Sequence, residues 1–208
     1  MTLIDISPAF RAGMPGWPGD TPFDAARSWS LGPDCPVNVS KIVLSSHVGS
    51  HADAPSHFDA EGRPIDAMPL ELYIGPCHVV DARGAGARIG VADVLPQLPG
   101  RVERVLIRQY EHYPEQWDAD LKGLEPALIA ALAARGVRLI GVDAASVDPA
   151  NSKTLDAHHA IEAHGIAIIE GLVLDAVAPG GYELIAPPLK IEGCDAAPLR
   201  AVLRTLTP

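Results

Sequence analysis

Three imidazoles and one carboxylate fall within eleven residues of this chain, at His47, His51, Asp53 and His57. All four positions are odd, so on an extended backbone their side chains would project from the same side. Full extension of this segment would span about 33 Å, which is too far for one site. The chain must therefore bend here, and Gly49 and Pro55 are the residues where a bend is easiest.

The residue types in this segment point to a metal site. Imidazole and carboxylate suit zinc, iron or manganese, and a carboxylate can bridge two ions. A metal needs more ligands than the segment supplies, and the remaining candidates lie downstream at His158, His159 and Glu170. On pattern alone, either histidine could instead be an exposed helix residue, and Glu170 could be a surface carboxylate at the end of a strand.

The segment 47–57, His-Val-Gly-Ser-His-Ala-Asp-Ala-Pro-Ser-His, resembles the HxGTHxDAPxH signature of the cyclase-like metal hydrolases. The departure from the signature is Ser50, which keeps the hydroxyl of the usual threonine. The similarity extends over nearly the whole chain and is greatest to the bacterial kynurenine formamidases, or arylformamidases, of that family. Four further segments fit the family pattern: residues 5–8, 15–20, 155–158 and 169–172.

The resemblance implies a role for each candidate site residue. It implies two divalent ions per subunit, usually zinc, with Asp53 bridging them and His57 as the catalytic proton donor and acceptor. His158 is preferred to His159 because it occupies the family's position twelve residues before Glu170. Trp17 would line the substrate pocket. The ligands of the first ion would be His47, His51 and Asp53, and those of the second would be Asp53, His158 and Glu170.

The resemblance also implies a reaction. It predicts hydrolysis of the small molecule N-formyl-L-kynurenine to L-kynurenine and formate, a step of tryptophan degradation by the kynurenine pathway. One alternative is a related amidohydrolase acting on another amide, such as isatin or a cyclic imide. Comparing turnover of formylkynurenine and isatin would separate this alternative from a formamidase. A second alternative is a metal-dependent binding protein without turnover, which a tight but unconverted ligand would favour.

Composition narrows the class of partner. The chain has 208 residues and a formal net charge of −10, without the basic stripe of a nucleic-acid binder. Three widely spaced cysteines form no CxxC pair, which is typical of free thiols in a reducing compartment. We find no leader-like N-terminus and no long apolar run, so we expect a cytoplasmic protein that binds neither membrane nor nucleic acid. The family expectation is a homodimer with loop exchange at the active site.

The distribution of apolar residues predicts a single α/β domain over residues 1–208, a compact mixed sheet with flanking helices. Within the family this is the cyclase-like fold of the swivelling β/α/β type. Residues 8–36 are expected to form a long irregular loop. Strands are expected at 1–6, 37–46, 78–81, 102–108, 137–142, 166–169 and 182–191. Helices are expected at 125–135, 155–164 and 199–206.

Several residues near these elements carry a weaker signal. Asp143 and Asp148 follow a predicted strand. Either could hold a metal ligand in place by a hydrogen bond, but a surface cap at the end of the strand is the expected role. Trp29 and Trp117 give no indication comparable to that of Trp17 in its proline- and glycine-rich loop.

Overall fold

A nine-stranded mixed sheet forms the centre of the computed structural model, which describes residues 1–206. Its strands follow the order β1-β13-β11-β5-β7-β9-β10-β4-β12. They are β1 (Leu3–Asp5), β4 (His51–Asp53), β5 (Ile74–Asp81), β7 (Arg104–Arg108), β9 (Leu139–Val142), β10 (Ala167–Glu170), β11 (Gly180–Ile185), β12 (Ala196–Pro198) and β13 (Val202–Thr205).

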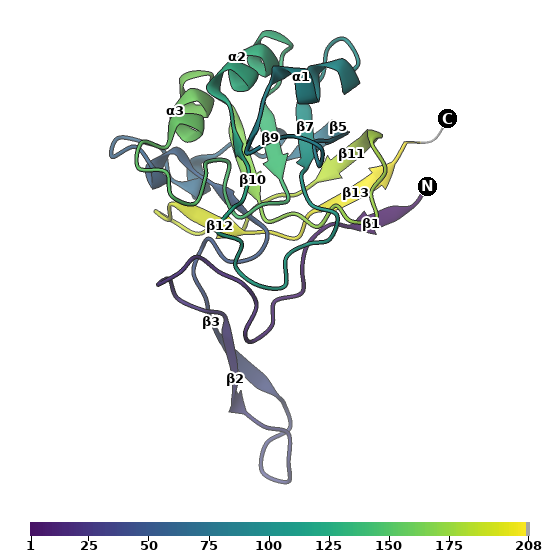
Figure 1. Ribbon diagram of the computed structural model, residues 1–208. Helices are drawn as coiled ribbons and strands as arrows, with labels where there is room; N and C mark the ends of the chain where they lie inside the picture. Colours follow the sequence, from purple (N-terminus) through teal and green to yellow (C-terminus); the bar gives the residue numbers. More distant parts are fainter. Residues whose placement is uncertain (207–208) are drawn as a thin grey trace.

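The four central strands β5, β7, β9 and β10 are parallel, and the outer strands join them antiparallel. Strands β7 and β9 are buried along their whole length, as expected for parallel strands covered on both faces. The helices α1 (Val91–Val94), α2 (Pro126–Ala134) and α3 (Asp156–Ala163) lie together on one face (Figure 1). The predicted mixed α/β fold is therefore confirmed.

Two apolar layers pack on the two faces of this sheet. Leu128, Leu132 and Ile161 belong to the layer beneath the helices, whereas Tyr73 and Leu184 belong to the other layer. A short parallel pair, β6 (Arg88–Ile89) and β8 (Gly123–Leu124), lies beside the helical layer. Within residues 1–206, no helix has both the length and the apolar character needed to cross a bilayer.

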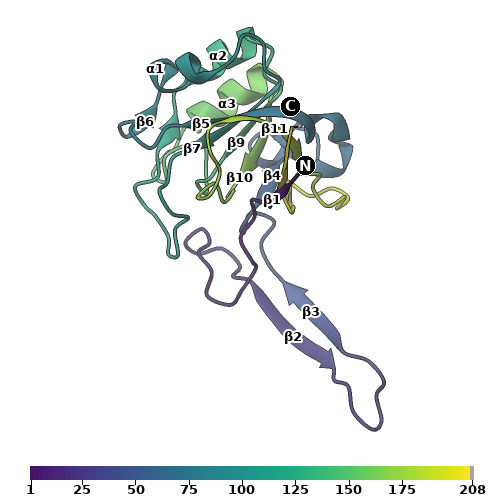
Figure 2. The same ribbon diagram turned by 90° about the vertical axis from the view of Figure 1, so that its right-hand side faces the viewer.

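A long arm projects from this body. It is the antiparallel hairpin of β2 (Asp24–Trp29) and β3 (Val39–Val43), and every residue of the two strands is exposed (Figures 1 and 2). The prediction of an irregular loop over residues 8–36 was wrong for β2. The sequence Asp-Ala-Ala-Arg-Ser-Trp contains no β-branched residue, so this strand is specified by its pairing with β3 and not by its own propensity.

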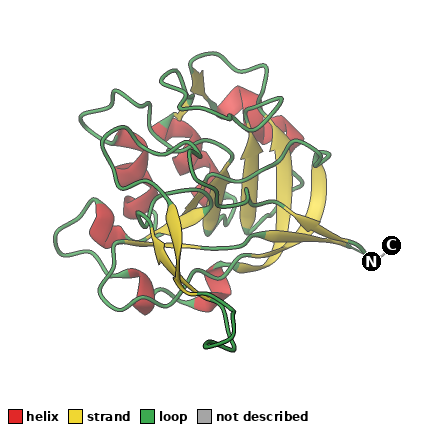
Figure 3. Cartoon of the chain, turned by 90° about the horizontal axis from the view of Figure 1, so that it is seen from below, coloured by secondary structure: helices red, strands yellow, loops and turns green. Residues whose placement is uncertain are grey.

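The predicted closing helix at residues 199–206 was also wrong, because this segment forms β13. Leu199, Ala201 and Leu203 are buried while Arg200 is exposed, and this alternation has the period of a strand. Strand β13 pairs with β1, which brings the two ends of the described chain to one edge of the molecule (Figure 3). The strand predicted at 182–191 ends earlier, at Ile185, shortly before two consecutive prolines.

Strand register and two glycines position the segment that carries the histidines. His51 of β4 lies opposite Glu170 of β10. Before β4 the chain turns at Gly49, and after β10 it turns at Gly171, with φ of 67° and 66°. A Cβ atom on Gly171 would overlap the Gly49 carbonyl, so the two turns pack backbone against backbone. The bends predicted at Gly49 and Pro55 are both present, since Pro55 begins a 3-10 turn, Pro55–His57.

We expect Gly171→Ala to lower the free energy of unfolding by about 2–3 kcal/mol, because the substitution combines a left-handed backbone with a backbone overlap. Gly165→Ala is the matched control. Gly165 also has a positive φ, of 62°, but its added Cβ would meet nothing within 4 Å. It should cost only about 1 kcal/mol. Urea denaturation of metal-free protein measures both, and equal losses would contradict the packing role of Gly171.

Candidate metal centre

The structure brings the predicted ligands together from four parts of the chain. His47 precedes β4, and His51 and Asp53 belong to it. His158 projects from α3, and Glu170 is the last residue of β10. Four of the five side chains are at least 96% buried, and His47 is partly exposed. The position at the carboxyl end of a parallel strand is where α/β sheets commonly bind ligands.

Asp53 occupies the middle of this cluster, which we call the ligand cluster: His47, His51, Asp53, His158 and Glu170. Its Oδ1 lies 3.1 Å from His47 Nδ1 and 3.3 Å from His51 Nε2. Its Oδ2 lies 3.5 Å from His158 Nε2. The two oxygens of one carboxylate therefore face different imidazoles, which is the arrangement a bridging ligand requires.

Glu170 closes the cluster between two of these imidazoles. Its Oε2 lies 3.4 Å from His51 Nε2, and its Oε1 lies 3.9 Å from His158 Nε2. The same Oε1 accepts a hydrogen bond of 2.8 Å from the Val147 amide, which fixes the carboxylate in place.

The cluster has the polar atoms of a site that holds a cation. His51 Nε2 and both Asp53 oxygens are buried and make no hydrogen bond. Leaving such atoms unsatisfied costs about 1–3 kcal/mol each, and more when they are charged. A divalent ion would satisfy all three. The donor set of imidazoles and carboxylates is one that zinc prefers, so the residues fit the metal that the sequence predicted.

The pKa values of the metal-free cluster also indicate a site that favours positive charge. Burial alone would raise the pKa of Asp53, but the neighbouring imidazoles of His158, His47 and His51 hold it well below its ordinary value. Burial would lower the pKa of His51 and of His158, but the carboxylates around them raise each to about 10. Without a metal the cluster therefore binds protons instead.

The outer nitrogens of two imidazoles are held by the protein. His51 Nδ1 donates to the Gly49 carbonyl at 2.9 Å, and His158 Nδ1 lies 2.7 Å from Asp148 Oδ2. Such partners fix the ring orientation of metal-binding histidines. As a result both Nε2 atoms point at Asp53 and Glu170.

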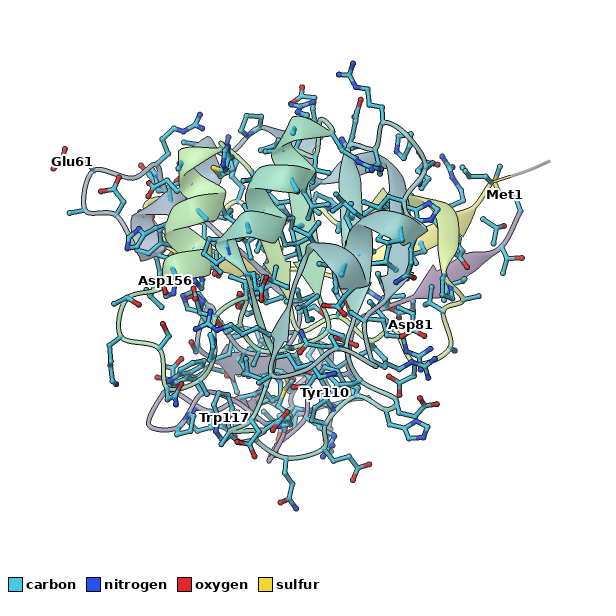
Figure 4. The ribbon with its side chains drawn as sticks, turned by 45° about the horizontal axis from the view of Figure 1, so that its top comes forward. Met1, Glu61, Asp81, Tyr110, Trp117 and Asp156 are labelled. Atoms are coloured by element: carbon cyan, nitrogen blue, oxygen red, sulfur yellow. The ribbon has the colours of Figure 1, made fainter. Side chains whose placement is uncertain are left out.

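We expect Asp148→Asn to weaken the affinity of the cluster for Zn²⁺ about 10–100-fold, as loss of a partner behind a metal ligand does in other sites. Asp148 also accepts hydrogen bonds from the Ala157 and His158 amides, so its loss loosens the start of α3. Competition with a chromogenic chelator measures the affinity. Asp156→Asn, an exposed change in the first turn of the same helix (Figure 4), is the control and should leave the affinity unchanged.

His57 lies beside the ligand cluster and is less buried than its members, with a side chain 33% exposed. Its ring centroid is 4.1 Å from that of His47 and 6.0 Å from that of His158. Its nitrogen and ligand atoms of Asp53 and His158 lie within 4.8 Å of one another. From this position His57 can exchange protons with a molecule bound beside the ligand cluster.

Sequence reasoning missed Asp195, which contacts two of the histidines. Its Oδ2 lies 2.8 Å from His47 Nε2 and 3.4 Å from His57 Nδ1, and its Oδ1 accepts a hydrogen bond from Ser46. Asp195 stands just before β12, far from the histidine segment in sequence and outside any of the recognised motifs. Only the pairing of β12 with β4 brings it to the site.

A cavity of about 360 Å³ opens from the ligand cluster. Its lining includes His57, His158 and Glu170 beside the ligand cluster, as well as Trp17 and Trp117. Trp17 is 42% exposed, and its ring lies edge-on to that of Trp117, 4.8 Å between centroids. The sequence around Trp117 carries no signal comparable to that around Trp17, and the loop after β7 nevertheless brings Trp117 into the cavity wall.

Asp143 lines the same cavity and is not a surface cap. It is 2% exposed and accepts hydrogen bonds from the Gln109 and Tyr110 amides, which begin the loop that carries Trp117. Burial raises the pKa of Asp143 to about 7, against the lowering effect of these amides. The surface interpretation failed because the strand β9 ends inside the molecule.

The other candidates lie outside the cluster. His159 is an exposed residue of α3, whereas its neighbour His158 is buried. Of the two histidines that the pattern left open, His158 is therefore the one that lies in the ligand cluster. The cysteines Cys35, Cys77 and Cys194 are free.

Comparison with known proteins gives consistent results. The Cyclase family model matches residues 4–149. A kynurenine formamidase of Maricaulis maris is 56% identical over 205 residues, 98% of each chain. A solved structure described as a potential metal-dependent hydrolase with cyclase activity superposes with a TM-score of 0.85 at 26% identity, covering 100% of this chain and 99% of the other. Isatin hydrolase A from Labrenzia aggregata, at 23% identity, has a TM-score of 0.83 with coverage of 99% and 94%, which bears on the fold alone.

Proposed function

The chain belongs to the Cyclase family, and we propose that it is a metal-dependent kynurenine formamidase that hydrolyses N-formyl-L-kynurenine to formate and L-kynurenine. The observation that carries the proposal is the buried carboxylate of Asp53, without hydrogen bonds among three imidazoles, at the end of a cavity with aromatic walls. The 56% identity to a kynurenine formamidase supports the substrate. In metabolism this reaction belongs to tryptophan degradation.

We propose the ligand set that the family resemblance implies. His47, His51 and Asp53 would hold one divalent ion, and Asp53, His158 and Glu170 would hold a second. Zinc is the ion proposed. When bound, such ions act as Lewis acids and lower the pKa of a coordinated water toward about 7.

The chain's own residues bind the substrate and deliver the proton. Hydrolysis transfers the formyl group to water and breaks its bond to the aniline nitrogen, which must take up a proton as it leaves. His57 lines the cavity and supplies that proton as the general acid. Trp17 and Trp117 form an apolar wall against which the aromatic ring of the substrate packs.

The test is an assay of metal-loaded protein in which formate and kynurenine are both measured. Equal amounts of the two products, lost on chelation and restored by zinc, are the expected result. Isatin is the competing substrate, and a higher kcat/KM on isatin would favour the related amidohydrolase. Tight binding of formylkynurenine without product would favour a binding protein. Fewer than one ion per chain in fully active protein would contradict the two-metal assignment.

We also propose that the chain is a homodimer held by its arm. The exposed apolar residues of the arm include Trp29, Leu31 and Ile42, each about 60% exposed. A two-stranded hairpin is marginally stable alone, and an apolar patch of this kind marks an interface. A second copy of the chain is the partner proposed, because the family expectation is a dimer.

Light scattering of an arm variant tests the dimer. Trp29→Asp together with Ile42→Asp should convert a dimer into a monomer. Leu189→Asp replaces an equally exposed apolar residue of the body and should leave the mass unchanged. A monomeric parent protein, or an arm variant that stays dimeric, would rule out the arm as the interface.

Two further proposals concern organisation and location. We propose one domain over residues 1–208, because both apolar layers pack on the same sheet; unfolding in one cooperative transition would support this. We propose a cytoplasmic location, because the three thiols are free. Recovery of the native protein in a membrane or secreted fraction would contradict it.

A further inference from the structure

The lining of the cavity has a composition that the reaction itself does not require. Two separate loops each contribute one tryptophan and one aspartate to its lining: Trp17 and Asp20 from the N-terminal loop, and Trp117 and Asp118 from the loop after β7. The two indole rings touch edge to face, so the two loops meet here. We call these four residues the rim. Figure 4 shows Trp117 and Tyr110 on the same side of the molecule, below the helices.

The carboxylates of the rim are oriented, but their charge is not compensated. Asp20 accepts a hydrogen bond from the Thr21 amide, and Asp118 accepts one of 2.8 Å from the Tyr110 hydroxyl. Neither forms an ion pair with a lysine, arginine or histidine of residues 1–206. The described residues that line the cavity include no lysine or arginine at all.

This combination suits one end of the proposed substrate better than the other. Formylkynurenine carries a primary ammonium and a carboxylate on the chain attached to its ring. An ammonium group is attracted to the faces of indole rings and to carboxylates. A carboxylate in the same place would be repelled by Asp20 and Asp118 and would find no lysine or arginine among the described lining residues.

We propose that the rim binds the ammonium group, so that the enzyme selects its substrates by positive charge and not by the carboxylate. The chemical class is an N-formyl aryl amine that carries a primary ammonium on its side chain. This inference rests on the proposed function, which it deepens by naming how the amino-acid end is recognised.

Three substrates test the inference on metal-loaded enzyme: formylkynurenine, its decarboxylated amine N-formylkynuramine, and its deaminated acid 4-(2-formamidophenyl)-4-oxobutanoate. Removing the ammonium should lower kcat/KM about tenfold or more, by the ordinary strength of such contacts. Removing the carboxylate should change it by less than a few-fold. A larger loss for the amine than for the acid would overturn the inference.

Asp20→Asn and Asp118→Asn locate the effect at the rim. Each should lower kcat/KM several-fold for the two ammonium substrates and much less for the deaminated acid, mainly through KM. A loss of folding or of metal would affect all three substrates alike and would count against the assignment. Asp120→Asn is the matched control. Asp120 lies in the same loop as Asp118 but does not line the cavity, and its substitution removes the same charge. It should change none of the ratios.

Failure of the inference and failure of the proposed function give different results. The minimal substrate 2′-formamidoacetophenone carries neither charged group, so its hydrolysis reports formamidase chemistry alone. If it is hydrolysed and the ammonium has no effect, only the inference fails. If no formamide is hydrolysed, the proposed function fails, and calorimetry of kynuramine against the deaminated acid of kynurenine still decides whether the rim prefers a cation.

Discussion

Replacing Asp53 by asparagine is expected to lower kcat/KM on formylkynurenine by about 10³-fold or more. Within the ligand cluster, Asp53 is the side chain whose two oxygens face all three imidazoles. An amide offers a single neutral oxygen, so it cannot bridge two ions or balance their charge. Lewis-acid assistance is worth several kcal/mol, and each 1.4 kcal/mol is about a factor of ten in rate.

Metal content separates this prediction from a folding defect. Asp53→Asn should retain at most one ion per chain, measured by atomic emission on protein purified with zinc, and should keep the circular dichroism of the parent. Glu61→Gln is the control, because it removes one exposed carboxylate close in sequence to the site (Figure 4). It should bind metal and turn over substrate as the parent does. Two tightly bound ions in the Asp53 variant would show that another group is the bridge.

The ligand segment was the part of the site that sequence alone predicted best, and the reason is physical. Its odd-numbered spacing and the length of an extended chain required bends, and the structure has them at Gly49 and Pro55. The distant ligands were harder. Pattern left His158 and His159 open, and the family resemblance favoured His158, which is the buried one.

What sequence did not predict depends on contacts between distant segments. Asp195 reaches His47 and His57 because β12 pairs with β4, and pairing of edge strands leaves no local signal. Trp117 reaches Trp17 because the loop after β7 is held by Asp143 from a neighbouring strand. Strand β13 was mistaken for a helix because a short apolar segment is ambiguous until its alternation is seen against a partner.

The role proposed for His57 rests more on family resemblance than on spacing. A His57 variant therefore tests a part of the proposal that the Asp53 variant does not. We expect His57→Ala to lower kcat about 10²–10⁴-fold while the protein keeps two ions per chain. The reason is that the aniline nitrogen must be protonated as it leaves, whereas the five-residue ligand cluster stays intact. His57 is partly exposed within the cavity, which suits a proton carrier better than a buried ligand.

Metal content and the effect of the leaving group distinguish a proton donor from an additional metal ligand. If His57 ligates a metal, as its closeness to Asp53 and His158 allows, the variant loses an ion along with its activity. If it donates the proton, the ions stay and the defect shrinks for formanilides whose ring carries a nitro group, because a less basic nitrogen needs less protonation to leave. His159→Ala removes a neighbouring exposed imidazole of α3 and should change neither quantity. Activity of His57→Ala within a few-fold of the parent would exclude both roles and would leave Asp195, which contacts His47 directly, as the next group to test.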